Sequence, residues 1–270
     1  MSITAADVSK LRNTTGAGMM DCKKALTEAD GDFEKAIEIL RKKGQKVAAN
    51  RADRDSSEGI VVSVINAEKT KGVVFSLNCE TDFVAKNEDF IKLANSISNI
   101  SINCSTKEEL LNSDFNGLTV HEKLIEQTGV IGEKIEIGSF KLISGNYLGT
   151  YIHAGSKIGT IVALSLKEEE VGRNIAMQIA AMNPLALDES AVDSSVIEKE
   201  LEIAKDQLRQ EGKPEEMLEN IAKGKLKKFF KDNTLLFQDY IKAENKESVN
   251  DYLKSIDSNL KISGFIRVGI

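Results

Sequence analysis

The spacing of apolar residues changes along this chain, and that change limits the folds that the chain can adopt. Up to about residue 50 the apolar side chains recur every three or four positions, which is the spacing of a helix buried on one side. Residues 59–65 and 72–77 instead form two strand-like runs, joined by the polar residues 68–71. A chain that keeps its helical and strand-like patterns in separate blocks is typical of an α+β protein.

Residues 1–54 are expected to form a module of three short helices. Thr4, with an aspartate three residues later, fits a capping box at the start of the first helix, and Asp32 fits the cap of the third. Gly44 fits the end of the third helix, because glycine is favoured just past a helix C-terminus. The polar run at 50–57 then predicts a linker.

The rest of the chain predicts a core of two related α+β subdomains with antiparallel strands, because the order hairpin, then amphipathic helix, occurs twice. The strand-like runs of the second half lie at 134–137, 148–153 and 159–164. The helix after them is expected to bury one stripe of residues, which comprises Val171, Ile175, Ile179 and Met182. We place the first subdomain at 55–140 and the second at 141–270, with a helical hairpin inserted at about 190–245.

Capping signals mark the later helices. Thr106, Thr119 and Ser195 each precede a glutamate by three residues, which is the spacing of a capping box. Pro214 suits the first position of the second helix of the hairpin, where its missing N–H is not needed.

Charge and cysteine usage argue against several classes of function. The formal net charge is −6, so the molecule as a whole is not expected to seek nucleic acid. The three cysteines and two histidines are too few and too widely spaced for a disulfide framework or a zinc site. No apolar run is long enough to span a membrane, and no leader segment is evident. We therefore expect a cytoplasmic protein with no metal and no cofactor of its own.

Two other kinds of site can be weighed from the residues alone. Cys79 and His153 would suit a thiol enzyme if they met, but a buried thiol and a packed histidine are the more common arrangement. The lysine-rich run at 223–231 suits contact with RNA, but we favour a helix whose lysines are solvated. No glycine-rich phosphate-binding loop is present, so we do not expect the chain to bind a nucleotide.

The segment TDFVAKN at 81–87 follows a strand-like run and opens an amphipathic helix. A large apolar residue beside a carboxylate at such a junction is either core packing or a protruding contact. Taken alone, Phe83 would be buried and Asp82 would cap the helix. Met19 and Met20 are neighbours on a helix, so at least one is expected to face solvent, where a flexible apolar side chain suits a protein contact.

TDFVAKN and the run LRNTTGAGMMDCKKAL at 11–26 resemble the elongation factor Ts family in two highly specific blocks. Weaker likeness at 131–133, 151–159 and 264–267 extends the resemblance over nearly the whole chain. It implies a ubiquitin-associated-like N-terminal module, and it favours a protruding Phe83. The residues that it implies as partner contacts are Thr81, Asp82, Phe83 and Val84, with Arg12, Met19, Met20, Ile131, Gly132 and His153.

The resemblance also implies a function, which is nucleotide exchange on the GTPase elongation factor Tu during translation elongation. Asp82 and Phe83 would be the central pair that disturbs the magnesium and phosphate site of the partner, so that GDP leaves and GTP can bind. Because no covalent chemistry is implied, we do not expect an enzyme. The family pattern allows a homodimer within a heterotetramer, and it has arginine where this chain has Lys157.

Overall fold

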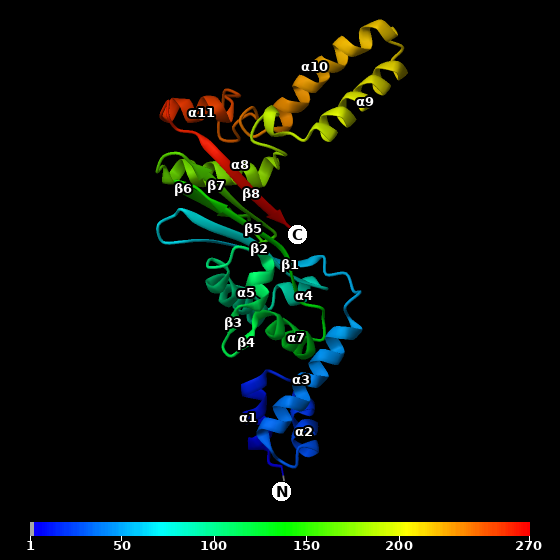
Figure 1. The fold of residues 1–270 in the computed structure, drawn as a ribbon, viewed down its shortest axis with the longest axis vertical. Helices are drawn as coiled ribbons and strands as arrows, with labels where there is room; N and C mark the ends of the chain where they lie inside the picture. Colours follow the sequence, from blue (N-terminus) through cyan, green and yellow to red (C-terminus); the bar gives the residue numbers. More distant parts are fainter. Residues whose placement is uncertain (1–2) are drawn as a thin grey trace.

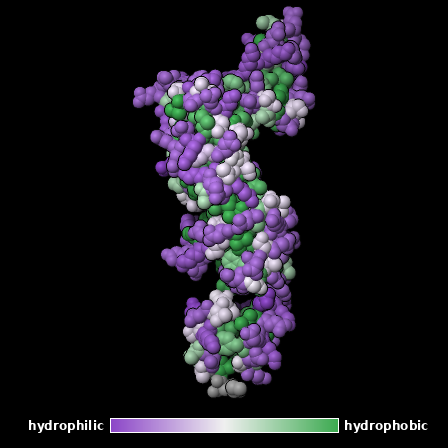
Figure 2. Space-filling view, turned by 60° about the vertical axis from the view of Figure 1, so that its left-hand side comes forward, coloured by the Kyte–Doolittle hydropathy of each residue, from purple (hydrophilic) through white to green (hydrophobic). Residues whose placement is uncertain are grey.

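The computed structural model describes residues 3–270, and it confirms the α+β class. The molecule is elongated, with the N-terminal helices at one end, two three-stranded sheets in the middle and a helical hairpin at the other end (Figure 1). Hydrophilic side chains cover most of the face seen in Figure 2, and hydrophobic ones gather in small patches between them.

The N-terminal module consists of α1 (Ala5–Thr15), α2 (Met19–Glu28) and α3 (Phe33–Asn50). Thr4 forms the expected capping box at the start of α1, and Asp32 caps α3 by accepting a hydrogen bond from the backbone of Lys35. The three helices close over their own small apolar core, which includes Leu11, Cys22, Leu26 and Ala36. This region therefore has a separate centre of packing from the sheets.

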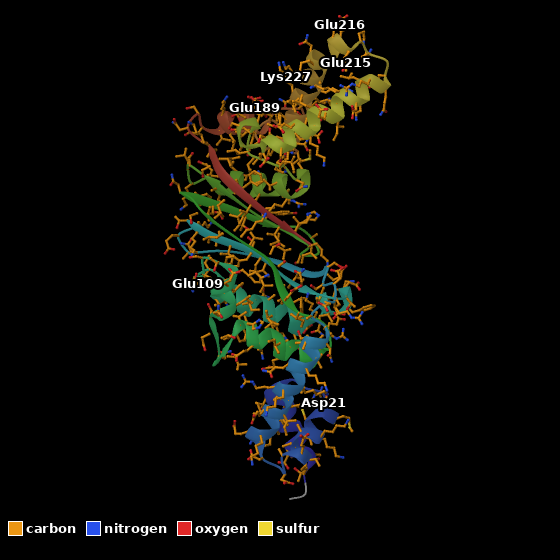
Figure 3. All side chains as sticks on the ribbon, turned by 45° about the vertical axis from the view of Figure 1, so that its right-hand side comes forward. Asp21, Glu109, Glu189, Glu215, Glu216 and Lys227 are labelled. Atoms are coloured by element: carbon orange, nitrogen blue, oxygen red, sulfur yellow. The ribbon has the colours of Figure 1, made fainter. Side chains whose placement is uncertain are left out.

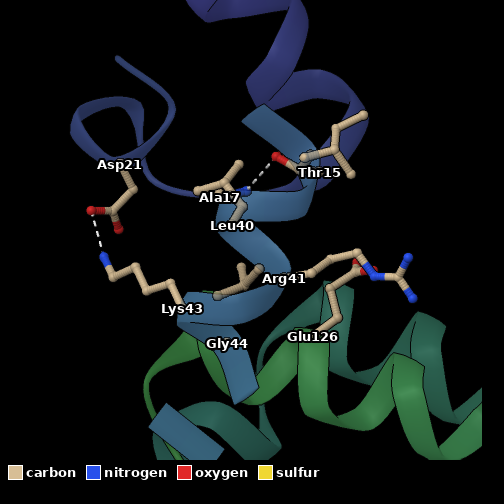
Figure 4. Close-up of a pocket in the computed structure, with 11 residues that line it drawn as sticks. Thr15, Ala17, Asp21, Leu40, Arg41, Lys43, Gly44 and Glu126 are labelled. Atoms are coloured by element: carbon tan, nitrogen blue, oxygen red, sulfur yellow. Dashed lines mark hydrogen bonds and ion pairs between the residues drawn. The ribbon is translucent and has the colours of Figure 1, made fainter. Parts of the chain in front are cut away.

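The prediction that Gly44 ends α3 is wrong. The helix continues to Asn50, and Gly44 lies inside it where α3 crosses α7 (Val120–Ile131). A Cβ atom on Gly129 of α7 would lie only 2.4 Å from the Cα atom of Gly44, so the two backbones meet directly. Figure 4 shows Gly44 facing the helix that carries Glu126. The glycine serves a close helix–helix approach, not a helix end.

The first sheet has the antiparallel order β1 (Glu58–Ile65), β2 (Lys71–Cys79) and β5 (Glu136–Ser144). Between β2 and β5 the chain forms the small elements α4 (Asp82–Ala85), α5 (Glu88–Ser101), α6 (Lys107–Asn112), β3 (Asp114–Phe115) and β4 (Leu118–Thr119), followed by α7. Thr119 forms the expected capping box at the start of α7, whereas Thr106 caps α6 without the reciprocal bond, because the Glu109 carboxylate accepts the backbone N–H of Ser105 instead. These helices and one face of the sheet share a core that includes Phe75, Leu77, Phe90, Ile97 and Ile137.

The second sheet repeats this order of a hairpin, a helix and a returning third strand. It contains β6 (Tyr147–Ile152), β7 (Ile158–Leu164) and β8 (Ile262–Gly269), with α8 (Glu169–Met182) on its outer face. The strand expected at 134–137 begins later and runs to Ser144, so the first sheet extends past residue 140. The two sheets pack face to face between the helices (Figure 1), through a buried cluster of Val61, Val74, Leu148, Ile161 and Val268.

One residue of the expected α8 stripe is not buried. Val171, Ile175 and Ile179 are in the core, but Met182 is 44% exposed. It is the last residue of α8, and Asn183 follows it with a left-handed backbone (φ 44°). The chain therefore leaves the sheet at Met182.

The helical hairpin consists of α9 (Ser194–Gln210) and α10 (Glu215–Asn233), and a short helix α11 (Val249–Ile256) follows, capped by Ser248. The prediction that Ser195 caps α9 is wrong. Asp193 caps this helix, and its carboxylate also accepts a hydrogen bond from the Ser195 hydroxyl. Pro214 precedes α10 as its N-cap residue and is not its first helical residue. The hairpin has its own apolar core of Ala204, Leu208, Leu218 and Ala222.

The crossing of α3 and α7 yields a test of the fold. We expect Gly129→Ala to lower the free energy of unfolding by about 1–3 kcal/mol, because the added methyl group has no room against the α3 backbone. Gly44→Ala is the matched control: the nearest atom to its added Cβ lies at 3.5 Å, an ordinary contact. There alanine should be neutral or stabilising by up to about 1 kcal/mol, since it favours the helix. Urea unfolding followed by circular dichroism measures both, and equal stability of the two variants would contradict the crossing.

Candidate protein-binding site

The TDFV segment (residues 81–84) begins just after β2 and forms most of the four-residue helix α4. Phe83 is 83% exposed, the highest value among the exposed large hydrophobic residues within 3–270. The core-packing interpretation of this residue is therefore wrong. Next to it Val84 is half-buried against the core of the first sheet, and Ala85 is buried. Because successive residues of a helix point about 100° apart, α4 anchors itself through Val84 while presenting Phe83 to solvent.

Asp82 does not cap the following helix. Asn87 caps α5 by accepting hydrogen bonds from the backbone of Asp89 and Phe90. The carboxylate of Asp82 instead lies 2.6 Å from the ammonium group of Lys86, one helical turn later. This hydrogen bond lowers the pKa of Asp82, so the group beside the exposed phenyl ring is a carboxylate at neutral pH. The arrangement presents an apolar side chain next to a negative charge.

The base of the TDFV segment is tied to the loop after α7. One oxygen of the Glu133 carboxylate accepts the backbone N–H groups of Glu80 (3.1 Å) and Thr81 (3.0 Å), and the other accepts the Thr81 hydroxyl (2.7 Å). In return the carboxylate of Glu80 accepts the backbone N–H of Lys134 at 2.7 Å. The guanidinium of Arg51, at the end of α3, donates to both Glu80 oxygens at 2.8 and 2.9 Å.

This tie brings two of the expected contact blocks together. Ile131 and Gly132 immediately precede Glu133, and Gly132 ends α7 with a left-handed backbone (φ 82°). Ile131 is half-buried against the core and also lines a surface groove. Residues 14–16 of the N-terminal module line the same groove. The TDFV segment, the end of α7 and the loop between α1 and α2 thus lie in one region.

The expected contacts of the N-terminal module are all exposed. Arg12 lies in the last turn of α1, and Met19 and Met20 open α2, where they are 59% and 64% exposed. Neither methionine belongs to the core of the module. Two unbranched apolar side chains in solvent form a small adaptable patch of the kind that suits a protein contact.

His153 is also exposed, and it lies in the turn between β6 and β7. Its Nδ1 atom is 3.2 Å from the hydroxyl of Tyr151. In the same turn, Lys157 forms an ion pair with Glu58 at the start of β1. The replacement of the family's arginine by Lys157 therefore retains a cationic link between the two halves, and the charge of Lys157 also helps to lower the pKa of Asp82.

Four residues of this region were missed in the sequence, namely Arg51, Glu58, Glu80 and Glu133. Each forms a contact to a residue at least 29 positions away, such as Arg51 to Glu80. The spacing of neighbouring residues in the sequence does not indicate contacts between residues so far apart. The one available signal was that Glu133 ends a block resembling the family, directly after Ile131 and Gly132.

The structure gives little support to a thiol enzyme. Cys79 is buried, and its thiol donates a hydrogen bond to the backbone oxygen of Thr81 at 3.2 Å. Burial, together with the nearby Glu133 carboxylate, raises the pKa of Cys79 to about 11, so the reactive thiolate is disfavoured at neutral pH. Among residues 3–270, no group of three histidine, cysteine or acidic side chains is placed to hold a metal ion.

The lysine-rich run at 223–231 lies on α10, where Lys227 is seen in Figure 3. Three of its lysines, at 223, 225 and 231, form ion pairs with Glu219, Glu211 and Asp239. Phe229 and Phe230 are half-buried. The paired lysines and half-buried phenylalanines fit the solvated lysine face that we favoured.

Residues 80–270 match the family described as Elongation factor TS. A protein of Flavobacterium psychrophilum called Elongation factor Ts is 62% identical over 100% of this chain and 99% of its own length. Relatives of the same name from Christiangramia forsetii and Amoebophilus asiaticus are 61% and 50% identical, each over 99% of this chain and over 98% and 99% of their own lengths.

The family match includes the TDFV segment, the end of α7 and the strands from β5 onward, and the relatives extend the match through β1, β2 and the N-terminal module. Within residues 3–270 no helix is both long and apolar enough to cross a bilayer. The resemblance seen in the two sequence blocks is thus confirmed over the whole chain: the protein belongs to the elongation factor Ts family of translation elongation factors.

Proposed function

We propose that this protein is the guanine nucleotide exchange factor of the GTPase elongation factor Tu and acts in the cytoplasm during translation elongation. The observation that carries the proposal is the exposure of Phe83, at 83%, on a helix anchored from beneath by Val84. Burial of an exposed phenyl ring by a partner is favourable, and this ring is already held outward.

The TDFV segment would act on the partner's nucleotide site. GDP is held in such GTPases in part through a magnesium ion, which demands near-ideal octahedral coordination. Phe83 entering between elements of the GTPase, with the Asp82 carboxylate competing for hydrogen bonds beside it, would displace groups that support the ion. Because binding free energies are reciprocal, whatever weakens GDP on the complex lets GDP weaken the complex equally.

The remaining contacts would supply the free energy that this distortion requires. Arg12, Met19 and Met20 are exposed on the N-terminal module, proposed to span 1–54, and Ile131 and Gly132 lie beside the TDFV segment. His153 would extend the surface from the first subdomain (55–140) to the second (141–270). Each step is binding and no bond is made or broken, so the protein would not be an enzyme.

The first prediction from the proposed function concerns Phe83. We expect Phe83→Ala to slow the release of a fluorescent GDP analogue from elongation factor Tu at least about tenfold, because truncating a central aromatic contact typically costs about 2 kcal/mol or more. Phe237→Ala is the matched control, since Phe237 is also exposed (43%) but lies beyond α10, away from α4.

Both variants should retain the far-ultraviolet circular dichroism of the wild type, because neither side chain is part of the core. Equal release rates for Phe83→Ala and the wild type would remove the TDFV segment from the mechanism. Absence of any acceleration by the wild type would remove the exchange function itself.

The second prediction separates exchange from thiol chemistry. We expect Cys79→Ser to retain most of the exchange activity, because serine keeps a donor for the Thr81 backbone oxygen. In the native wild type, Cys79 should resist alkylation by iodoacetamide at pH 8, since its pKa is raised to about 11 and the side chain is buried. Mass spectrometry of the peptide that carries Cys79 measures the labelling, since Cys22 and Cys104 are also free thiols. Rapid labelling of Cys79 with loss of GDP release on Cys79→Ser would favour a thiol-dependent activity.

A further inference from the structure

We propose that Glu133 is a positioning residue for nucleotide exchange, in that it holds the TDFV segment at the angle from which Phe83 acts. This role rests on the proposed exchange function. Glu133 is half-buried at the start of the loop that leads from α7 to β5, and its carboxylate reaches across to the chain leaving β2. No contact of its own with the partner is required.

Three donor groups converge on the carboxylate of Glu133. Glu133 accepts the N–H groups of two successive residues, Glu80 and Thr81, and the hydroxyl of Thr81, over distances of 2.7 to 3.1 Å. Two adjacent N–H groups directed at a single oxygen restrict the backbone angles of the peptide between them. Bonds to an ionised acceptor are also among the stronger hydrogen bonds of a protein.

Thr81 is the residue just before α4 begins. It occupies the N-cap of α4, where a threonine hydroxyl normally accepts a hydrogen bond from the first turn. Here its side chain makes no such bond, and the hydroxyl donates to Glu133 instead. The direction in which α4 begins is therefore set by Glu133. Phe83 lies in the first turn of α4, so a rotation of its start moves the phenyl ring.

The connection between the loop after β2 and the loop after α7 is reciprocal. The Glu80 carboxylate accepts the backbone N–H of Lys134, which is the main cause of its lowered pKa, and it also pairs with Arg51. The loop after β2 and the loop after α7 thus each hold the backbone of the other. Arg51 adds the end of α3, which connects the N-terminal module to the same point. The Glu80 and Glu133 carboxylates thus hold the expected contact residues of the neighbouring segments in fixed positions relative to one another.

The proposal predicts a split between rate and affinity. Glu133→Ala leaves the exposed contact residues in place but frees the start of α4. Because the other contacts carry much of the binding, the factor concentration giving half-maximal GDP release should stay within about twofold of the wild type. The maximal release rate should fall at least about tenfold, since the loss of this set of charge-assisted bonds misdirects Phe83.

Glu133→Gln is the matched control. Its amide oxygen can accept both backbone N–H groups, and its amide nitrogen can donate to the Thr81 hydroxyl, which is able to accept. We expect this variant to retain at least about half of the maximal rate, because the geometry survives without the charge. Thr81→Val, which removes only the hydroxyl contact, should give an intermediate loss and replaces Glu133→Ala if that variant does not fold.

The experiment measures release of a fluorescent GDP analogue from elongation factor Tu over a range of factor concentrations. In parallel, hydrogen–deuterium exchange of the free factor should show faster exchange at residues 80–81 in Glu133→Ala and no change in Glu133→Gln. An unchanged maximal rate in Glu133→Ala would overturn the positioning role, and so would a loss in Glu133→Gln as large as in Glu133→Ala. A raised half-maximal concentration at full rate would overturn it too, by making Glu133 an ordinary contact. Failure of the wild type to accelerate release would instead overturn the exchange function, and with it this role.

Discussion

The apolar contact between the two sheets is the constraint on which the rest of the molecule depends. Val61 and Val74 from the first sheet bury the same cluster as Leu148 and Ile161 from the second, so the sheets are held at a fixed offset. Backbone bonding reinforces that offset, since the N–H of Val61 donates to Ser156 across the interface at 2.7 Å. If one sheet slipped relative to the other, packed side chains would become exposed and this hydrogen bond would break at the same time.

The offset decides which strand ends meet. Glu58 of β1 is paired in register with Cys79 of β2 and forms an ion pair with Lys157 of the β6–β7 turn. The exit of β2, from which the TDFV segment emerges, therefore lies at the same end of the sandwich as the turn that carries His153. The proposed partner surface combines both halves because the strand register brings those two ends together. Sites on the ends of packed strands are more rigid than sites on free loops.

Much of the fold follows from local patterns, and the exceptions have a common cause. Thr4, Asp32 and Thr119 were correctly predicted as caps, because a cap involves only the next three residues. Gly44 was misassigned because its role depends on Gly129, and no spacing within α3 reports a glycine on another helix. The exposure of Phe83 contradicts what a phenylalanine alone suggests, and only the family resemblance pointed to it. The role of Glu133 was missed for the same reason, since its three donors lie more than 50 positions earlier in the chain.

The anchoring of α4 has a consequence for the timing of the interaction. Ordering a residue costs about 1–2 kcal/mol of backbone entropy, and a flexible contact segment incurs that cost each time it binds. Here the packing of Val84 against the core and the bonds at Thr81 order the segment when the protein folds. Binding then requires no search among loop conformations. The free protein is in this sense preorganised, and an encounter with its partner can become productive without waiting for the contact segment to fold.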